Sequence, residues 1–326
     1  LNNKTLYKYY NTYNCKNIYA YFLERNMSLL KDSGMMGMIV PISYTATKRM
    51  KPIRESLLKH SKYHFCASFA DRPSSLFVGV HQKINIILLE KGRPGKKHNY
   101  TTSYYHWNST EKKTLFKDIS YVENKFDSQD FMLKVGSKIE SSIIGKLLFN
   151  NYKKSLIEYI DNNGSRSIFV NMRIGFFNKS FSKPQTSKEY REFKFLKREH
   201  AVIFNAFLNS NIFFFIWESV SDCWHLTMSN LSCIKLNFDA FTKEDIHSLN
   251  NLLELLEGNL IKKRKPVHTK QTAFEYQHKK EKIIMDDIDM IFQSYFKLTN
   301  QELDFLKQYQ LKYRLNDEYD NYIKLV

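Results

Sequence analysis

The sequence predicts an α/β protein built in three consecutive parts, and three patterns along the chain support this. Helical spacing alternates with short apolar runs over residues 1–97, aromatic-rich strand-like runs occupy residues 98–242, and leucine stripes with capping residues fill residues 243–326. The 326 residues suffice for two or three domains, and 43% hydrophobic side chains suffice for a buried core. We therefore expect an α/β domain, then a mixed α+β domain, then a helical tail, with these boundaries.

The first part shows the clearest alternation of helix and strand. Its first helix has apolar residues three and four positions apart and stops before Gly34, a residue suited to a helix end. The run Met35–Val40 is apolar throughout and ends at Pro41, as a buried strand does. In chain order we expect a helix over Asn17–Leu30, a strand over Met35–Val40, a helix over Thr47–His60, and strands over Tyr63–Phe69 and Lys83–Glu90.

Short runs and capping signals define the elements after residue 97. Thr242 precedes Glu244 and Asp245, which the helix dipole favours in a first turn. Thr299 followed three residues later by Glu302 is a capping-box pattern. We expect strands over Ser167–Val170, Ile174–Phe177 and Leu231–Phe238, a buried helix over Val202–Trp217, and helices after Thr242, over Phe274–Tyr295 and after Thr299.

Charge is the strongest compositional signal. Fifty basic and thirty-three acidic residues give a net charge of +17, while residues 281–326, with nine acidic and six basic side chains, carry −3. Residues 1–280 therefore carry +20, a field that concentrates polyanions such as nucleic acids near the surface. A genome rich in A and T would produce a similar composition, because Lys greatly outnumbers Arg and Asn, Ile, Tyr and Phe are plentiful.

Several familiar sites are missing from the sequence. It contains no G-x-x-x-x-G-K-[ST], G-x-G-x-x-G, H-E-x-x-H or G-x-S-x-G motif. Four widely spaced cysteines without a C-x-x-C pair indicate reduced thiols of a cytoplasmic protein, and no apolar run approaches the roughly 18 residues of a membrane span. The chain begins with Leu and shows no secretory signal, so we expect a part of a longer cytoplasmic protein without a membrane partner.

Two residue groups could suggest chemistry, and each has a plainer interpretation. Asp286, Asp287 and Asp289 point in different directions on a helix, so we expect a solvated helix face and no metal site. His225 beside Trp224 could act as a base, although a packed or surface histidine is the simpler interpretation. The residues by themselves therefore specify no active site.

One series of segments carries a family resemblance. It comprises Ile18–Arg25, Leu29–Lys31, Gly34, Gly37–Pro41, then Phe69–Val80 and Ile84–Lys91. Their order and spacing resemble DNA N6-adenine methyltransferases of the gamma order, from type II and related restriction–modification and phage-defence systems. The resemblance covers roughly residues 6–91. It implies the carboxyl-terminal part of a Rossmann-like methyltransferase sheet.

A second series is similar to target-recognition domains. It comprises Phe207–Ser210, Leu226–Leu231 and Ile234–Leu236, followed by the helix after Thr242 and by Leu298–Phe305 and Tyr313-Arg314 near the end. Such domains occur in these methyltransferases and in type I specificity subunits. The resemblance therefore implies a catalytic-domain portion over 1–97, a target-recognition domain over 98–242 and a tail over 243–326.

The departures from the family decide what this chain could do. The Asn-Pro-Pro-Tyr motif and the Gly-rich S-adenosylmethionine loop are missing, and in the gamma order both precede the region covered here. The resemblance thus implies an adenine-N6 methyltransferase whose S-adenosylmethionine is bound mainly by an upstream segment, so that this chain holds no catalytic residue and is inactive alone. Double-stranded DNA is the implied partner, together with a restriction or methyltransferase subunit. A non-catalytic specificity subunit is the alternative, and an RNA-binding protein is a third.

The resemblance and the charge together nominate site residues. Phe77 matches the family's aromatic residue that stacks on the extruded adenine; the other interpretation is an ordinary core phenylalanine at a strand edge. Basic residues interleaved with aromatic ones suit a DNA surface, and equally a half-buried sheet with a solvated face. The DNA-binding candidates are Arg166, Arg173, Lys179, Lys183, Lys188 and Arg191, together with Lys262, Lys263, Arg264 and Lys265, which could also be a solvated helix end.

Overall fold

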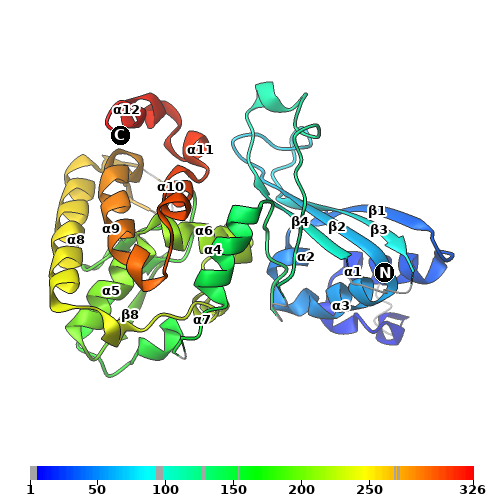
Figure 1. Ribbon diagram of the computed structural model, residues 1–326, viewed down its shortest axis with the longest axis horizontal. Coiled ribbons are helices and arrows are strands. Elements are labelled where there is room, and N and C mark those ends of the chain that lie inside the picture. Colours follow the sequence, from blue (N-terminus) through cyan, green and yellow to red (C-terminus); the bar gives the residue numbers. More distant parts are fainter. Residues whose placement is uncertain (1–5, 93–97, 127–129, 153, 268, 270–271) are drawn as a thin grey trace. The chain divides into compact units, whose positions relative to one another are not determined.

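The computed structural model describes residues 6–92, 98–126, 130–152, 154–267, 269 and 272–326 (Figure 1). The chain divides into two compact units. The first unit contains Leu1–Ser141 with Glu218–Asp222, and the second contains Ser142–Trp217 with Cys223–Val326. The four cysteines, all within the described residues, form no disulfide with one another.

A five-stranded mixed sheet is the centre of the first unit. Its order is β1-β3-β2-β4-β5, and β3 is antiparallel to both β1 and β2 while β4 is parallel to β2. The strands β1, β2 and β4 therefore run in the same direction. Their bounds are Met35–Pro41 for β1, Ser61–Phe69 for β2, Ile84–Lys91 for β3, His98–Tyr105 for β4 and Val122–Glu123 for β5, which confirms the three strands expected before residue 97.

Two helices cover one face of this sheet (Figure 1). The helix α1 (Ile18–Leu29) begins where the Asn17 side chain accepts a hydrogen bond from the Tyr19 amide at 3.3 Å, and α3 (Lys51–His60) carries Pro52 in its first turn, where proline is tolerated. The short α2 (Ser43–Ala46) follows β1. Side chains on one face of β1 and β3 share a core with Leu23 and Leu57 of these helices. The strand residues are Met36, Val40, Ile87 and Leu89.

The second unit combines a small antiparallel sheet with many helices. The sheet order is β7-β6-β8, with β6 over Arg166–Asn171, β7 over Ser180–Phe181 and β8 over Tyr190–Phe195. The two-residue strands β9 (Lys265–Pro266) and β10 (Phe274–Glu275) pair with each other. The helices are α4 (Lys138–Leu148), which begins in the first unit, α5 (Arg198–Leu208), α6 (Asn211–Val220), α7 (Met228–Ser232), α8 (Lys243–Lys263), α9 (Lys282–Tyr295), α10 (Asn300–Gln308), α11 (Leu311–Leu315) and α12 (Tyr319–Ile323).

The buried helix expected over Val202–Trp217 is in fact two helices. α5 and α6 meet at a 68° bend because Asn209 and Ser210 satisfy backbone groups with their side chains. The Ser210 hydroxyl donates to the Phe207 carbonyl oxygen at 2.6 Å and accepts from the Phe213 amide at 3.0 Å. No single helix among the described residues is long and apolar enough to cross a membrane; α5 and α6 meet that length and composition only as this bent pair.

Three other expectations about elements are wrong in part. Residues 174–177 form no strand, and Leu231–Phe238 begins inside α7, because Thr227 and Asn230 form a capping box that starts a helix there. The helix expected from Phe274 begins at Lys282, after β10 and a short 3-10 turn. The caps expected at Thr242 and Thr299 are confirmed, with side chains that accept from the Asp245 and Glu302 amides.

The first unit continues beyond residue 97, because β4 and β5 complete its sheet. The assignment of functional domains to 1–97, 98–242 and 243–326 stays a prediction.

Candidate functional site

The carboxyl ends of β1, β2 and β4 meet at one edge of the first sheet. In open α/β sheets ligands bind beyond this edge, because the loops that follow the strands are free to vary there. Two such loops project from the same end of the sheet (Figure 1). We call residues 70–83, between β2 and β3, the Phe77 loop, and residues 106–121, after β4, the lysine loop.

The two ends of the Phe77 loop are tied together. Lys83 and Asp71 form an ion pair at 3.0 Å, with side chains only 15% and 9% exposed, so water screens the pair poorly. The carbonyl oxygen of Arg72 receives a hydrogen bond from His106 Nδ1 at 2.8 Å, and His106 Nε2 lies 3.1 Å from a Glu218 carboxylate oxygen. These contacts hold the base of one loop against the start of the other.

The tip of the Phe77 loop is a tight turn. The Val80 amide donates to the Phe77 carbonyl oxygen at 3.2 Å, and Gly79 between them has φ +74°, a conformation that favours glycine. Phe77 is 45% exposed and Val78 94% exposed, so the tip presents apolar side chains to solvent. An exposed Phe77 is not the core phenylalanine of the plainer interpretation, and its stacking role stays a prediction.

The lysine loop combines cations with an exposed ring. It begins with a capping box between Asn108 and Glu111, which orders the turn that follows. Phe116 is 55% exposed, and its ring centroid lies 5.8 Å from that of Phe69 at the end of β2. The exposed cations of this loop are Lys112, Lys113 and Lys117.

Buried polar side chains link the strands beneath this edge. The His64 ring lies between the Tyr44 hydroxyl, 2.9 Å from Nε2, and the Asn99 side-chain oxygen, 3.0 Å from Nδ1. A neutral ring satisfies both, with Nδ1 as donor and Nε2 as acceptor, and burial lowers the pKa of His64 to about 4. These bonds position the strands that carry the two loops.

The residues that hold the two loops in place were not among the site residues expected from the sequence. Asp71 and Lys83 lie twelve positions apart, and only the pairing of β2 with β3 brings them together. His106 and Glu218 are separated even further. The lysine loop, by contrast, has a local signal, because Phe116 stands among three lysines within six residues.

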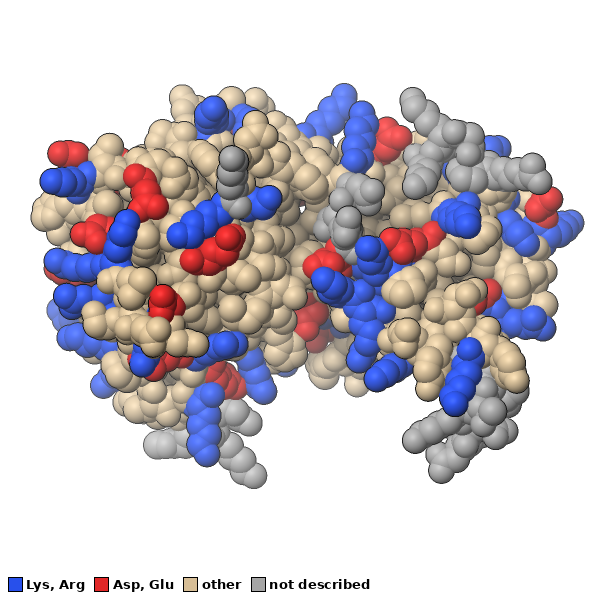
Figure 2. Space-filling view, turned by 90° about the horizontal axis from the view of Figure 1, so that it is seen from below, with Lys and Arg blue, Asp and Glu red and all other residues tan. Residues whose placement is uncertain are grey.

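The basic residues expected to bind DNA are spread over the small sheet of the second unit. Arg166 lies opposite Phe195 and Arg191 opposite Val170, which places the two arginines at opposite ends of the β6–β8 pairing. In the view of Figure 2, basic side chains are interspersed with acidic ones. Of the other candidates, Arg173 pairs with Glu189 at 2.9 Å, Lys183 and Lys188 are exposed, and Lys179 is half-buried with a pKa lowered by burial.

One of these arginines, Arg166, lines a groove of about 510 Å³ that a further arginine, Arg198, also lines. Arg166 and Arg198 line it together with Glu254 and Asn250, between β6, α5 and α8. At its base Glu257 accepts from the Ser182 amide and hydroxyl and from the Asn205 amide group, so that this carboxylate holds structure together.

The four basic residues at the end of α8 have different surroundings. Lys263 pairs with Glu281 at 2.6 Å, and the Arg264 guanidinium lies 3.9 Å from the centroid of the Phe274 ring. Lys262 and Lys265 are exposed, at the helix end where cations complement the dipole. All ten candidates therefore stay predictions as DNA contacts.

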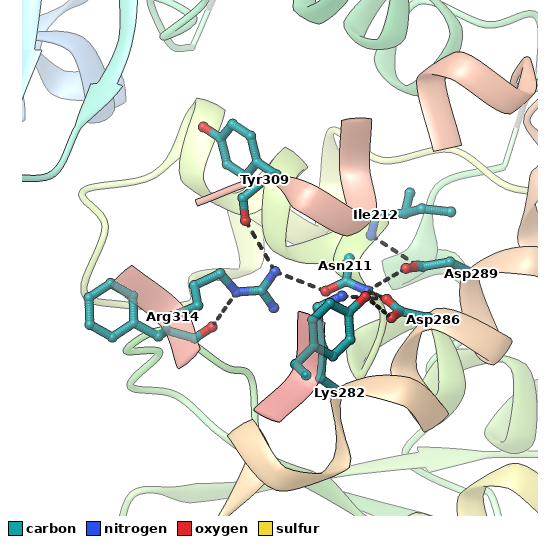
Figure 3. Close-up of polar contacts among 9 residues, drawn as sticks. Asn211, Ile212, Lys282, Asp286, Asp289, Tyr309 and Arg314 are labelled. Atoms are coloured by element: carbon teal, nitrogen blue, oxygen red, sulfur yellow. Dashed lines mark hydrogen bonds and ion pairs between the residues drawn. The ribbon is translucent and has the colours of Figure 1, made fainter. Parts of the chain in front are cut away.

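We expected Asp286, Asp287 and Asp289 to form a solvated face of α9, and this is wrong for Asp286 and Asp289, while Asp287 is partly exposed. Asp286 is 5% exposed and Asp289 is fully buried, because α9 turns this side toward the start of α6 and the last helices (Figure 3). Asn211 donates from Nδ2 to both carboxylates, at 2.9 and 2.5 Å. Among the described residues no group of three or more His, Cys, Asp or Glu side chains is placed to hold a metal ion.

Arg314 completes this buried cluster, which we call the Arg314 cluster: Asn211, Lys282, Asp286, Asp289, Arg314 and Tyr322. Arg314 donates to the Asn211 side-chain oxygen at 2.8 Å (Figure 3). Its guanidinium also lies 4.7 Å from the centroid of the Phe177 ring and 4.2 Å from that of the Phe214 ring. The Tyr322 hydroxyl donates to Asp286 at 2.6 Å, and Lys282 pairs with the same carboxylate. Burial raises the pKa of Asp289 to about 7 and lowers that of Lys282 to about 8.

Comparison with known proteins relates the first part of the chain to one family. Residues 1–77 match the family model described as Eco57I restriction-modification methylase, and no curated protein matches the chain. Two solved structures are similar at low identity. A nuclease-deletion mutant of the Type ISP restriction-modification enzyme LlaGI, in complex with a DNA substrate mimic, is 15% identical with a TM-score of 0.33, over 50% of this chain and 14% of that one.

The second structure is the type IIG restriction endonuclease BpuSI. It is 10% identical with a TM-score of 0.36, over 92% of this chain and 48% of that one. The chain thus spans less than half of either protein. The amino-terminal part of the chain is related to restriction–modification methylases.

Proposed function

We propose that this chain is the carboxyl-terminal portion of a DNA adenine-N6 methyltransferase from a restriction–modification system. The strongest support comes from the position of Phe77. The family match ends at residue 77, and Phe77 is an exposed aromatic residue beyond the carboxyl ends of strands that run in the same direction. One antiparallel strand, β3, lies between two of them, an arrangement that we interpret as the last part of a Rossmann-like methyltransferase sheet.

The chemistry explains why an exposed aromatic residue matters. An adenine inside a duplex hides its exocyclic nitrogen, so the enzyme has to extrude the base before a methyl group reaches it. Stacking on an aromatic ring stabilises an extruded base by about 1–3 kcal/mol. Phe77 would supply that ring. S-adenosylmethionine would be held mainly by a segment upstream of this chain, which itself lacks the Gly-rich loop.

Residues 98–242 would recognise the DNA site. Arg166, Arg191 and the exposed lysines between β7 and β8 would contact phosphates and base edges, and Lys262–Lys265 would contact phosphates. The domain assignment proposed for this function is catalytic over 1–97, target recognition over 98–242 and tail over 243–326. A restriction or methyltransferase subunit would be a protein partner, and the enzyme would act in the cytoplasm.

Phe77→Ala in the intact enzyme tests this proposal. Single-turnover methyl transfer to duplex DNA should fall about ten- to a hundredfold, because the stacking energy is lost, while Phe77→Trp should retain most of the rate. Circular dichroism and thermal unfolding should be unchanged, since the side chain is exposed. Equal rates for Phe77→Ala and the parent enzyme would remove Phe77 from the site.

The alternative has a distinct outcome. If the chain binds duplex DNA but methyl transfer by its natural complex uses another polypeptide for the whole catalytic domain, it is a non-catalytic specificity subunit. Preference for single-stranded RNA over duplex DNA in a competition assay would instead favour an RNA-binding protein.

A further inference from the structure

We propose that the Phe77 loop and the lysine loop together bind duplex DNA, with Val78 inserted into the base stack beside the extruded adenine. This inference rests on the proposed function and extends it to residues that neither the charge pattern nor the family resemblance singles out. It assigns Val78 as an apolar wedge and Lys112, Lys113 and Lys117 as phosphate contacts.

The turn at the tip of the Phe77 loop exposes Val78 and holds its backbone in place, as an inserting side chain requires. Val78 is 94% exposed, and the bond from the Val80 amide to the Phe77 carbonyl oxygen fixes the turn around it. The Ser75 hydroxyl donates to the same carbonyl oxygen at 2.9 Å. Apolar side chains that enter a duplex partly unstack a base step, which costs a few kcal/mol, so the backbone that carries them has to be rigid.

The base of the loop supplies that rigidity. The Asp71–Lys83 pair joins its two ends, and the bond from His106 to the Arg72 carbonyl oxygen ties it to the first residue of the lysine loop. Both loops also leave β2 and β4, which are neighbouring parallel strands, so that their starting points are fixed by the sheet. Phe77 and Val78 are adjacent residues of one turn, and a base held on the first would leave its gap near the second.

The charges on the lysine loop identify the partner. Lys112, Lys113 and Lys117 are all exposed and outnumber the one exposed carboxylate of the loop, Asp118, whereas Glu111 accepts a capping bond from the Asn108 amide at 2.7 Å. Exposed apolar side chains beside several cations suit duplex DNA, because its phosphates are anionic and its stacked bases accept an inserted apolar side chain. Anionic lipid vesicles share the charge but not the stack, and they serve as an arm of the test.

The phosphate contacts are tested by the salt dependence of binding. Fluorescence anisotropy of a labelled duplex should show that K112A/K113A/K117A makes the negative slope of log K against log salt shallower by about 2.7, from three contacts at about 0.9 each. The control is K31A/K59A/K62A, three exposed lysines elsewhere in the first unit, which should leave the slope unchanged. Equal slopes for the two triple variants would overturn the assignment of the lysine loop.

The wedge is tested with a duplex that carries one abasic site. Because the gap is already open, the parent chain should bind this duplex about tenfold more tightly than the intact one, and Val78→Ala should abolish the preference without changing the salt slope. Val326→Ala, at a residue 72% exposed, is the matched control. A preference that survives in Val78→Ala would overturn the wedge, and tighter binding to anionic vesicles than to DNA would overturn both assignments.

These assays need no methyl transfer, so the two proposals fail separately. If the chain gives both expected binding results but the intact enzyme transfers no methyl group, the DNA-binding role of the two loops is supported and the methyltransferase proposal is overturned. If the intact enzyme transfers methyl groups but the variants of both loops bind DNA like the parent, the methyltransferase proposal is supported and the role of the loops is overturned.

Discussion

His64 illustrates how one buried side chain makes the stability of the first unit depend on pH. Its two ring nitrogens contact Tyr44 and Asn99, and burial lowers its pKa from 6.5 to about 4. Between these values the unfolded chain binds a proton that the folded unit excludes, so the folded unit loses stability as the pH falls from about 6.5 toward 4. Above about 6.5 the full contribution is present.

We expect His64→Gln to flatten this acid dependence. Urea unfolding of the first unit, measured between pH 4 and 7, should show a smaller loss of stability on acidification than the parent protein shows, although the variant is less stable at pH 7 because the ring contacts are lost. His81→Gln, at an exposed position, should behave like the parent. Parallel pH profiles for His64→Gln and the parent would contradict the assigned neutral ring.

At the scale of elements, the end of the chain is held by buried charges and not by apolar contacts alone. Arg314 of α11 reaches Asn211 at the start of α6 and the Phe176 carbonyl oxygen, at 2.8 and 3.1 Å, and Tyr322 of α12 reaches Asp286 of α9. Removing one member of such a cluster leaves its partners buried and unsatisfied, which costs more than the loss of one bond in water.

Arg314→Lys should therefore loosen α11 and α12. A lysine keeps the charge but lacks the planar guanidinium that donates to both acceptors and contacts two aromatic rings, so we expect a loss of about 2–4 kcal/mol and faster proteolysis within residues 311–323. Lys324→Ala, at an exposed residue, serves as the control. If Arg314→Lys matches the control in both measurements, the cluster does not hold these helices.

At the scale of the whole molecule, two compact units each have their own interior. The core of the first unit lies between its sheet and the helices α1 and α3, and Phe193 and Phe195 of the small sheet pack against Phe204 of α5 in the second. Units with separate cores need not unfold in one cooperative step.

Calorimetry should resolve this independence. We expect two unfolding transitions because each unit has its own core, with His64→Gln lowering the Tm of one and Arg314→Lys lowering the Tm of the other. A single transition that both variants shift equally would show that the chain unfolds as one cooperative unit.

The sequence alone determined the features that depend on neighbouring residues. The caps at Thr242 and Thr299 and the strands before residue 97 are where capping chemistry and periodicity place them, because these signals act within a few residues. Phe77 was nominated by the family resemblance of the segment Phe69–Val80. The α5–α6 bend was missed although Asn209, Ser210 and Asn211 interrupt the apolar pattern, because the hydrogen bonds that Asn209 and Ser210 make to the backbone form only in the folded chain.

Only the tertiary structure decided which distant residues meet. The placement of β3 between β1 and β2, the Asp71–Lys83 pair, the link from His106 to the Phe77 loop and the burial of Asp286 and Asp289 all join segments that no short pattern connects. The physical reason is that burial and pairing energies belong to surfaces formed when the chain folds back on itself. The solvated face expected for α9 was wrong on this account, since whether a carboxylate is solvated depends on what packs against it.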